Sequence, residues 1–313
     1  MGKHNYIAVG ALALLLLLLP LLLPSSYYLG VAVFVGLYTL IVIGLSLLMG
    51  YAGQISLGHA GFFAIGAYAS GLLTAKAHWP PLLALPTAVL LTAVIAFLIG
   101  TPSLRLRGHY LAMATLGFGQ IVHVAATASV RLTGGPSGFG SIPRISIGRW
   151  VISSQLARYY TTWAIVLGAL IFSFNLIHSR VGRALRSIHG SEVAANAMGI
   201  NTARYKIQVF VLSAVYAAIA GSLYAHSVTF VSPSACDLKL SILLVTMVVV
   251  GGISNLWGAF LGAVLLGILP ELLRSFKDYD ILFYGMILLL IMMFAPEGLW
   301  GLIKGIGQRW SKR

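Results

Sequence analysis

Charge is scarce in this sequence of 313 residues, of which 8% are charged and 59% are hydrophobic. In soluble globular domains about a quarter of the residues are charged, so this composition indicates a protein that crosses the membrane several times. Acidic residues are especially few, with six Asp and Glu against twenty Lys and Arg. This excess of base does not indicate a nucleic-acid partner, because cytoplasmic loops of membrane proteins collect Lys and Arg.

Groups that carry chemistry are also missing from the sequence. The single cysteine, Cys236, excludes an internal disulfide and a cysteine-based metal cage. There is no G-x-x-x-x-G-K-[ST] phosphate loop, no nucleophile–base pair and no cluster of metal ligands. We therefore expect a chain that is not an enzyme and that binds no metal, nucleotide or other cofactor itself.

The six acidic residues all lie at the ends of apolar segments or in the loops between them. Ion-coupled carriers usually keep an ionisable residue inside the membrane. This distribution argues against a secondary carrier. If the chain transports a substrate against a gradient, the energy must come from another subunit.

Ten apolar segments predict the fold, since a helix of about 20 apolar residues crosses a bilayer. We predict an all-α, polytopic membrane helix bundle with about ten transmembrane helices, glycine-rich broken segments and one transmembrane domain over residues 1–313. Eight or nine helices remain an alternative, because one segment begins in a polar stretch and two others are separated by three residues. The segments are 7–23, 29–49, 56–75, 82–100, 109–128, 159–178, 207–227, 239–253, 257–273 and 281–295.

The distribution of basic residues predicts the orientation. With the N-terminus inside and six spans before residue 179, the inner side carries twelve bases and two acids, and the outer side eight bases and four acids. Both termini and residues 179–206 are therefore expected in the cytoplasm.

Residues 50–71 combine six glycines with polar groups at the point where a span should begin. Irregular backbone at membrane depth persists only where it is buried in protein or lines a wet cavity. A discontinuous helix along a translocation path would use Gly53, Gln54, Ser56 and His59. A tight packing seam with a polar helix start is an equally good interpretation.

Two further segments contribute candidates for such a path. Thr115 and Gln120 lie at roughly helical spacing on segment 109–128, where they either line the path or connect helices by hydrogen bonds. Residues 252–263 echo residues 53–67 in a short, gapped match, which suggests an internal repeat and adds Ser254 and Asn255.

The loop over residues 129–158 contains the turn-forming sequence TGGPSGFGSIP at 133–143. It is either a plain external loop or a short structured element at the outer mouth, where a delivery protein could dock. Trp150, Tyr159 and Tyr160 are expected at the membrane interface.

Residues 179–206 predict a surface for a soluble partner. Ser191 is a plausible N-cap, Glu192 lies in the first helical turn, and Gly199 ends the helix. A short helix with a slim surface fits a groove on a partner, although an ordinary basic loop is the alternative. The residues expected to contribute to this surface are Arg183, Glu192, Ala194, Ala195, Met198, Gly199 and Ile200.

Several long stretches resemble one known family. They include GLSLLMGYAGQISLGHAGFFAIGAYASGLL at 44–73, RGHYLAMATLGFGQIV at 107–122, LTGGPSGF at 132–139, SRVGRALRSIHGSEVAANAMGINTARYKIQVFVLSAVYAAIAGSLYAH at 179–226 and VVVGGISNLWGAFLGAVLLGIL at 248–269. In this combination and order they resemble the permease subunits of bacterial ABC importers for branched-chain amino acids, specifically the LivM-type subunit.

The resemblance implies a multi-pass protein of the bacterial plasma (inner) membrane, surrounded by membrane lipid. It implies a heterodimer with a homologous LivH-type permease, two ABC ATPase subunits that bind ATP and Mg, and an extracytoplasmic binding protein that delivers leucine, isoleucine or valine. Glu192, Ala194 or Ala195, and Gly199 match the coupling-loop motif of importers.

Other functions remain open at this point. Permeases for urea and short amides share many of the same motifs and are the alternative within the family. A passive facilitator would explain the glycine-rich segments without the capped cytoplasmic helix, and a secondary carrier would need a coupling site that the sequence does not show.

Overall fold

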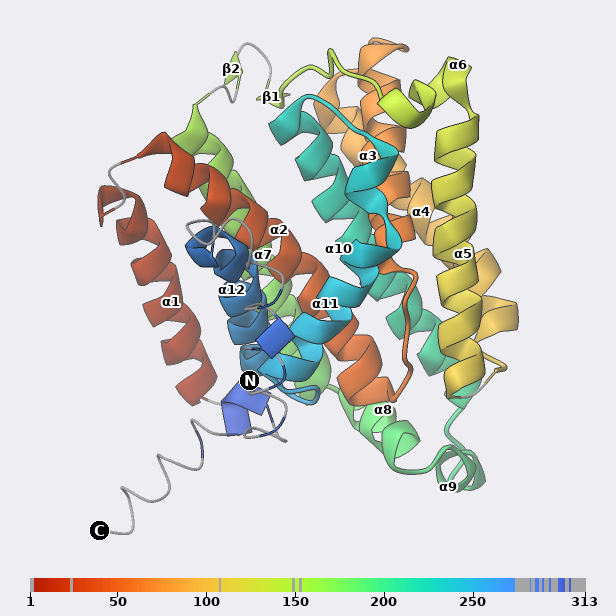
Figure 1. The fold of residues 1–313 in the computed structure, drawn as a ribbon. Helices are drawn as coiled ribbons and strands as arrows, with labels where there is room; N and C mark the ends of the chain where they lie inside the picture. The colour runs from red at the N-terminus through yellow and green to blue at the C-terminus, as the bar shows by residue number, and fades with distance from the viewer. Residues whose placement is uncertain are drawn as a thin grey trace.

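The structure, a computed structural model, is a bundle of helices (Figure 1). It describes residues 3–22, 25–106, 108–147, 150–151 and 154–273, with residues 282, 285, 286, 289, 293, 298–301 and 304. In these ranges the only strands are β1 (Ser146–Ile147) and β2 (Trp150–Val151), which pair antiparallel. The predicted helical membrane bundle is thus confirmed.

The helices follow one another in the order α1 (Lys3–Leu22), α2 (Ser26–Ser46), the π-helical turn η1 (Leu47–Tyr51), α3 (His59–Ala75), α4 (Pro81–Ser103), α5 (His109–Ala128), α6 (Val130–Thr133), the 3-10 turn η2 (Gly135–Ser137), α7 (Gln155–His178), α8 (Arg180–Gly190), α9 (Glu192–Ala197), α10 (Thr202–Val228), the 3-10 turn η3 (Pro233–Cys236), α11 (Leu238–Gly251) and α12 (Leu256–Leu273).

Nine of the ten predicted segments coincide with helices, and segment 281–295 lies largely outside the described residues. Seven helical stretches of the described chain are long and apolar enough to cross a membrane, so the expected count of about ten is not confirmed. Two helices are short: α3 has 17 residues and α11 has 14. These helices are about 25 and 21 Å long, whereas the hydrocarbon core of a bilayer is about 30 Å thick.

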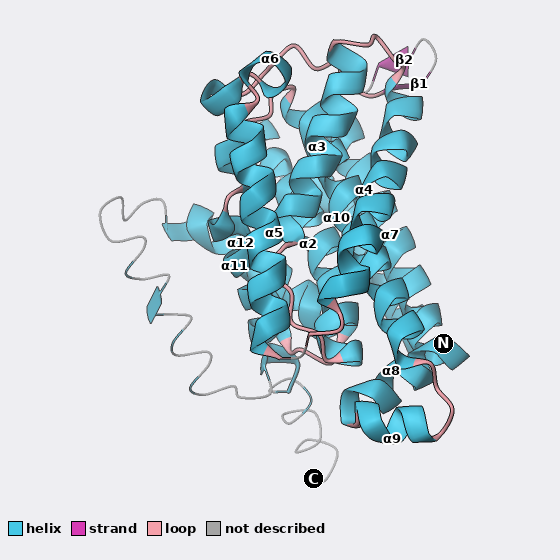
Figure 2. Ribbon diagram, turned by 90° about the vertical axis from the view of Figure 1, so that its right-hand side faces the viewer, coloured by secondary structure: helices cyan, strands magenta, loops and turns pink. Residues whose placement is uncertain are grey.

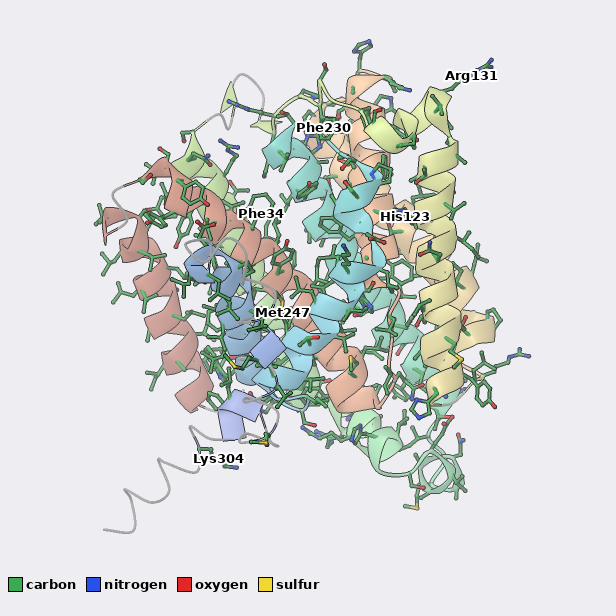
Figure 3. All side chains as sticks on the ribbon, viewed as in Figure 1. Phe34, His123, Arg131, Phe230, Met247 and Lys304 are labelled. Carbon is green, nitrogen blue, oxygen red and sulfur yellow. The ribbon has the colours of Figure 1, made fainter. Side chains whose placement is uncertain are left out.

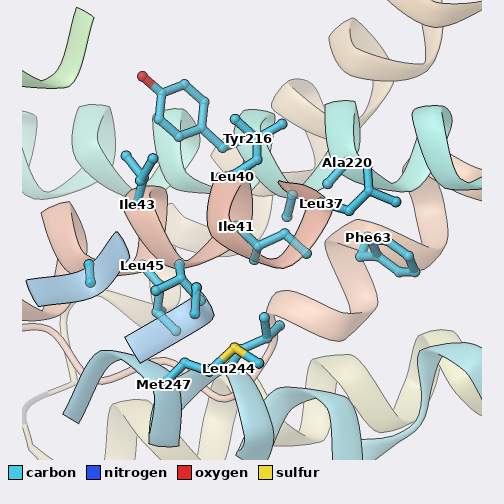
Figure 4. Packing of buried hydrophobic residues seen from close by; sticks show 14 of the residues in the cluster. Leu37, Leu40, Ile41, Ile43, Leu45, Phe63, Tyr216, Ala220, Leu244 and Met247 are labelled. Atoms are coloured by element: carbon cyan, nitrogen blue, oxygen red, sulfur yellow. The ribbon is translucent and has the colours of Figure 1, made fainter. Parts of the chain in front are cut away.

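Helix α2 lies at the centre of the bundle and packs against α7, α10, α11 and α12. Its side chains Leu40, Ile41 and Ile43 are completely buried, and Figure 4 shows them between Tyr216 of α10 and Met247 of α11. A helix that is apolar on every side is stable only when other helices surround it. The unbroken apolar sequence of α2 therefore accounts for its central place.

Helices α3 and α10 pack backbone against backbone. A Cβ atom at Gly66 would overlap the carbonyl group of Ala218, and one at Gly221 would overlap that of Phe63. Small residues permit such close approach in membrane bundles, where packing and hydrogen bonds hold helices together.

Buried hydrogen bonds join α3 and α10 at both ends of this contact. Near one end, His59 Nε2 of α3 lies 2.6 Å from Ser213 Oγ of α10. Near the other end, His226 Nε2 of α10 lies 2.8 Å from Ser70 Oγ of α3. Each helix contributes one histidine and one serine, so we expect the two helices to move as one body.

A proline on α1 determines how α1 packs against α7. Pro20 has no N–H to donate to the carbonyl of Leu16, four residues earlier. The hydroxyl of Tyr159 donates to that carbonyl over 2.8 Å, in a buried position. The tyrosine thereby supplies the hydrogen bond that the helix lacks.

The two ends of the bundle differ. Helices α8 and α9 extend beyond the bundle at one end, and Figure 2 shows them beneath α7. Arg131 lies at the opposite end of the bundle from Lys304 (Figure 3).

Candidate coupling surface and translocation path

Helix α9 is built as the sequence predicts. The hydroxyl of Ser191 accepts a hydrogen bond from Ala194 N over 3.3 Å, and Glu192 occupies the first turn. Gly199 follows the helix with φ of 80°, in the left-handed region that favours glycine. These features confirm the predicted N-cap and helix end.

Helix α8 was not predicted. It is amphipathic: Gly182, Ala184, Leu185 and Ile188 are buried, whereas Arg183 is exposed. A Cβ atom at Gly182 would overlap the carbonyl of Ile177, so the glycine allows α8 to lie close under the end of α7. The basic residues of this stretch had suggested a loop, but the apolar spacing is that of a helix on a surface.

The two faces of α9 have different surroundings. Val193 and Met198 are 69% and 83% exposed, and Ala194 is exposed as well. Ala195 is only 3% exposed, so it packs against the protein. The prediction that Ala195 contributes to the slim outer surface is therefore wrong, because its place on the helix turns it inward.

Glu192 also turns toward the bundle. Its Oε1 lies 2.7 Å from Lys206 Nζ on α10, and Lys206 donates a second hydrogen bond to the carbonyl of Leu104 over 3.0 Å. Thr202 donates to Asn196 Oδ1 over 3.0 Å. The ion pair thus connects α9 with α10 and with the end of α4.

A second connection runs from α8 to the segment before α3. Gly53 has φ of 67°, and a Cβ at this position would lie 3.0 Å from His189 Nδ1. The absence of a side chain lets residues 52–58 pass directly over the end of α8. Movement of α8 would therefore act on the backbone that leads into α3.

Residues 53–58 have no regular secondary structure and connect η1 to α3, with Gly53 and Ile55 exposed. The side chain of Gln54 donates to Ala52 O over 3.0 Å, and Thr115 Oγ1 accepts from Leu57 N over 3.0 Å. Ser56 Oγ lies 3.1 Å from His59 Nδ1, whose other ring nitrogen faces Ser213. The predicted path residues Gly53, Gln54, Ser56, His59 and Thr115 are therefore brought together here.

The helical structure is also interrupted before α11. After α10, residues 229–237 return along the bundle, and α11 starts partway down (Figure 1). Figure 3 shows Phe230 toward the Arg131 end and Met247 toward the Lys304 end, with His123 of α5 at an intermediate height. The first turns of α3 and α11 meet, because Ala60 N donates to Ser241 Oγ over 3.1 Å.

Gln120 lies where these two helices meet. It lines a small cavity with Leu57 and Ala60 from the α3 side and Cys236, Leu238 and Ser241 from the α11 side. Its own side chain is exposed on α5.

Ser254 and Asn255 are not part of this group. Ser254 Oγ donates to Gly50 O over 3.4 Å, and Asn255 Oδ1 accepts from Trp257 N over 2.8 Å at the start of α12. The break between α11 and α12 packs against η1, since a Cβ at Gly50 would overlap the carbonyl of Ile253.

The connection after α5 is structured. Phe139 and Val231 form an isolated antiparallel bridge, and Lys76 Nζ donates to the carbonyls of Arg131 and Leu132 over 2.7 and 2.8 Å. Of the two interpretations of residues 133–143, this geometry agrees with a structured element.

Among the described residues, no group of three or more His, Cys, Asp or Glu side chains is placed to hold a metal ion.

Comparisons with known proteins identify the family. Residues 27–296 match the family described as branched-chain amino acid transport system / permease component. The chain belongs to this permease family. The resemblance to LivM-type permeases is thereby confirmed.

The similar proteins include both types of permease. The LivM permease protein of the high-affinity branched-chain amino acid transport system is 34% identical over 289 residues in Salmonella typhimurium and 33% in Escherichia coli. These matches cover 84% of this chain and 67% of each relative. The LivH permease protein of Escherichia coli is 27% identical, over 84% of this chain and 91% of the relative. No solved structure matches the chain.

Proposed function

We propose that this chain is the membrane-spanning permease subunit of an ABC importer for branched-chain amino acids. Leucine, isoleucine or valine would be delivered by an extracytoplasmic binding protein, and separate ATPase subunits would bind ATP and Mg and supply the energy. The family membership supports this proposal, as does the lack of a phosphate loop in the sequence. The chain itself needs no cofactor for this role.

The exposed face of α8 and α9 is the proposed docking surface for an ATPase. We define this coupling surface by Arg183, Val193, Ala194 and Met198. The observation that carries the proposal is that the exposed helix α9 is tied by a largely buried ion pair to α10. A partner that holds α9 can therefore displace a spanning helix.

Movement of α9 would reach the path by two routes. Through Lys206, the movement would displace α10 and the end of α4. Helix α3 would move with α10, because the two helices are joined by hydrogen bonds. Through the contact of His189 with Gly53, the movement would also displace residues 52–58. ATP binding in the partners would in this way shift the bundle between outward-open and inward-open states.

The same assignment places α8, α9 and both termini in the cytoplasm of a bacterial cell, in agreement with the distribution of basic residues. The structured outer connection at residues 133–143 would then meet the binding protein. We retain about ten transmembrane helices in one domain over residues 1–313 as part of the proposal.

The second permease is proposed to be a LivH-type homologue. Residues 53–58 have no regular secondary structure, with Gly53 and Ile55 exposed, and Gln120 is exposed on α5. Such groups are unfavourable against lipid, so this face is expected to meet a wet path and the second permease. The face is weakly polar, which suits substrates with aliphatic side chains.

Reconstitution tests the proposal. Vesicles with this chain, the second permease, both ATPases and the binding protein are expected to concentrate leucine only when ATP is supplied to the ATPases. Concentrative uptake by the permeases without any ATPase would show a secondary carrier instead. Transport of urea in place of leucine would retain the class and change the substrate.

A further inference from the structure

Helices α3 and α11 of this permease begin inside the bundle rather than at one of its ends. Helix α11 starts next to Gln120, since Leu238 and Gln120 line the same cavity. Gln120 lies eleven residues after the start of α5 and eight before its end. At about 1.5 Å per residue it is about 16 Å from one end of α5 and about 12 Å from the other. The start of α11 is therefore near the middle of the membrane.

This position brings two charged residues of opposite sign to mid-depth. Asp237 is the N-cap of α11, and its Oδ1 accepts a hydrogen bond from Leu238 N over 2.6 Å. Lys239 follows in the first turn and is exposed, whereas Asp237 is half-buried. Within the described part of the chain, the Lys239 side chain has no ion-pair or hydrogen-bond partner, and the Asp237 carboxylate has none besides Leu238 N.

A charged side chain at mid-depth on a lipid-facing helix costs about 2.5–3.5 kcal/mol. This cost falls when the side chain faces water, a protein partner or a ligand of opposite charge. Exposed Gln120 lies nearby on α5, and the irregular residues 53–58 border the same cavity through Leu57. These features make it unfavourable for lipid to cover this face.

We propose that Asp237 and Lys239 bind the two charged groups of the amino acid as it passes through the membrane. The Asp237 carboxylate accepts hydrogen bonds from the substrate ammonium group, and the Lys239 ammonium donates to the substrate carboxylate. Gln120, which shares a cavity with Leu238 between these two residues, adds a neutral donor and acceptor on α5. This inference rests on the proposed transport function and names the part of the substrate that the permease recognises.

The surroundings agree with a zwitterion that carries an aliphatic side chain. Leu57, Leu116 and Leu238 contribute apolar surface at the cavity beside Gln120. The hydroxyl of Tyr68 is buried and has no hydrogen-bond partner among the described residues. Its ring packs on Phe139, which bridges to Val231 in the segment that leads down to Asp237. Urea carries no formal charge and would leave both Asp237 and Lys239 without a partner.

Charge-neutral variants of the complete transporter test the site in proteoliposomes. Asp237→Asn removes the charge and keeps a good N-cap, and Lys239→Gln removes the charge of the lysine. For each we expect leucine uptake to fall about tenfold, equivalent to about 1.4 kcal/mol, while ATPase activity stimulated by the binding protein stays within about twofold of the unmodified complex. Lys239→Arg should retain most of the uptake.

Lys304→Gln is the control, since Lys304 is an exposed base outside both the proposed site and the coupling surface (Figure 3). It should leave both activities unchanged. Leucine uptake at the unmodified rate in both Asp237→Asn and Lys239→Gln would overturn the site, as would a parallel loss of uptake and stimulated ATPase activity, which indicates a structural role. If the unmodified complex shows no ATP-dependent uptake, the transport proposal itself fails and the site fails with it.

Discussion

The Nζ atom of Lys206 lies 2.7 Å from Oε1 of Glu192, and this ion pair joins α9 to α10. The lysine side chain is 4% exposed and the glutamate side chain 22%, so the pair lies at the boundary between the bundle and the coupling surface. Lys206 also donates to Leu104 O at the end of α4. One lysine therefore connects a short exposed helix to two long helices of the bundle.

The coupling surface can be tested without disturbing the fold. Val193→Asp and Met198→Asp place a charge on side chains that are 69% and 83% exposed. We expect both variants to lose most of the ATPase that co-purifies with the permease, because apolar contact with the ATPase is replaced by a desolvated charge. Their thermal midpoints should barely change, since such surface substitutions usually alter stability by no more than about 0.5 kcal/mol.

Arg131→Gln, at the other end of the molecule, is the control for this measurement. Undiminished ATPase recovery with both Asp variants would remove Val193 and Met198 from the docking surface.

The contact between α3 and α10 predicts a strong effect of one methyl group. Gly66→Ala places a Cβ against the Ala218 carbonyl, so the helices must separate. We expect a loss of about 1–3 kcal/mol in stability, measured as a lower midpoint of thermal unfolding in detergent. Gly168→Ala on α7 is the matched control, because no atom lies within 4 Å of the added carbon. Equal midpoints for the two variants would contradict the close backbone contact.

The hydrogen bond between Tyr159 and Leu16 O predicts a coupled pair of substitutions. Tyr159→Phe leaves a buried carbonyl unpaired and should cost about 1–3 kcal/mol. In a Pro20→Ala background the new N–H of residue 20 can donate to Leu16 O, so the same substitution should cost much less. Unfolding midpoints of the four proteins in this cycle measure the coupling.

Tyr160→Phe is the control in this cycle. Tyr160 donates to Leu17 O over 3.2 Å from an exposed position, and Leu21 N remains available to that carbonyl. We expect little change in the midpoint. A cost of Tyr159→Phe that does not depend on residue 20 would contradict the role assigned to Pro20.

The helices and the caps of α9 could be predicted from sequence because hydropathy and local capping signals determine them. Ser191 and Gly199 act at the positions where the sequence places them. The inward direction of Ala195 could not be predicted in this way. It depends on how α9 lies against the bundle, which no local signal records.

The depth of α11 could not be predicted for a related reason. Asp237 stands at the end of an apolar segment, and a segment end is ordinarily at the membrane surface. Residues 229–237 instead return along the bundle, so this end lies next to Gln120, near the middle of α5. The sequence therefore places Asp237 correctly at the end of a helix, but not beside the middle of α5. Hydropathy counts apolar residues and does not show where a helix starts along the membrane normal.

Loss of the Glu192–Lys206 pair should separate ATP hydrolysis from transport. Glu192→Gln removes the charge of α9 that holds Lys206, and Lys206→Met removes the partner on α10. The exposed docking residues are unchanged, so the ATPases should still bind. We expect transport per ATP hydrolysed to fall about tenfold, as expected when about 1.4 kcal/mol of coupling is lost. The exchanged pair, Glu192→Lys with Lys206→Glu, should recover part of this loss.

The most direct test of the account measures leucine taken up and ATP hydrolysed in the same proteoliposomes, for the unmodified transporter and for Glu192→Gln. The account predicts that the ATPases remain bound and active while the ratio of leucine to ATP falls about tenfold. An unchanged ratio, with the variant folded and fully assembled, would show that energy does not enter the permease through α9 and would contradict the central claim.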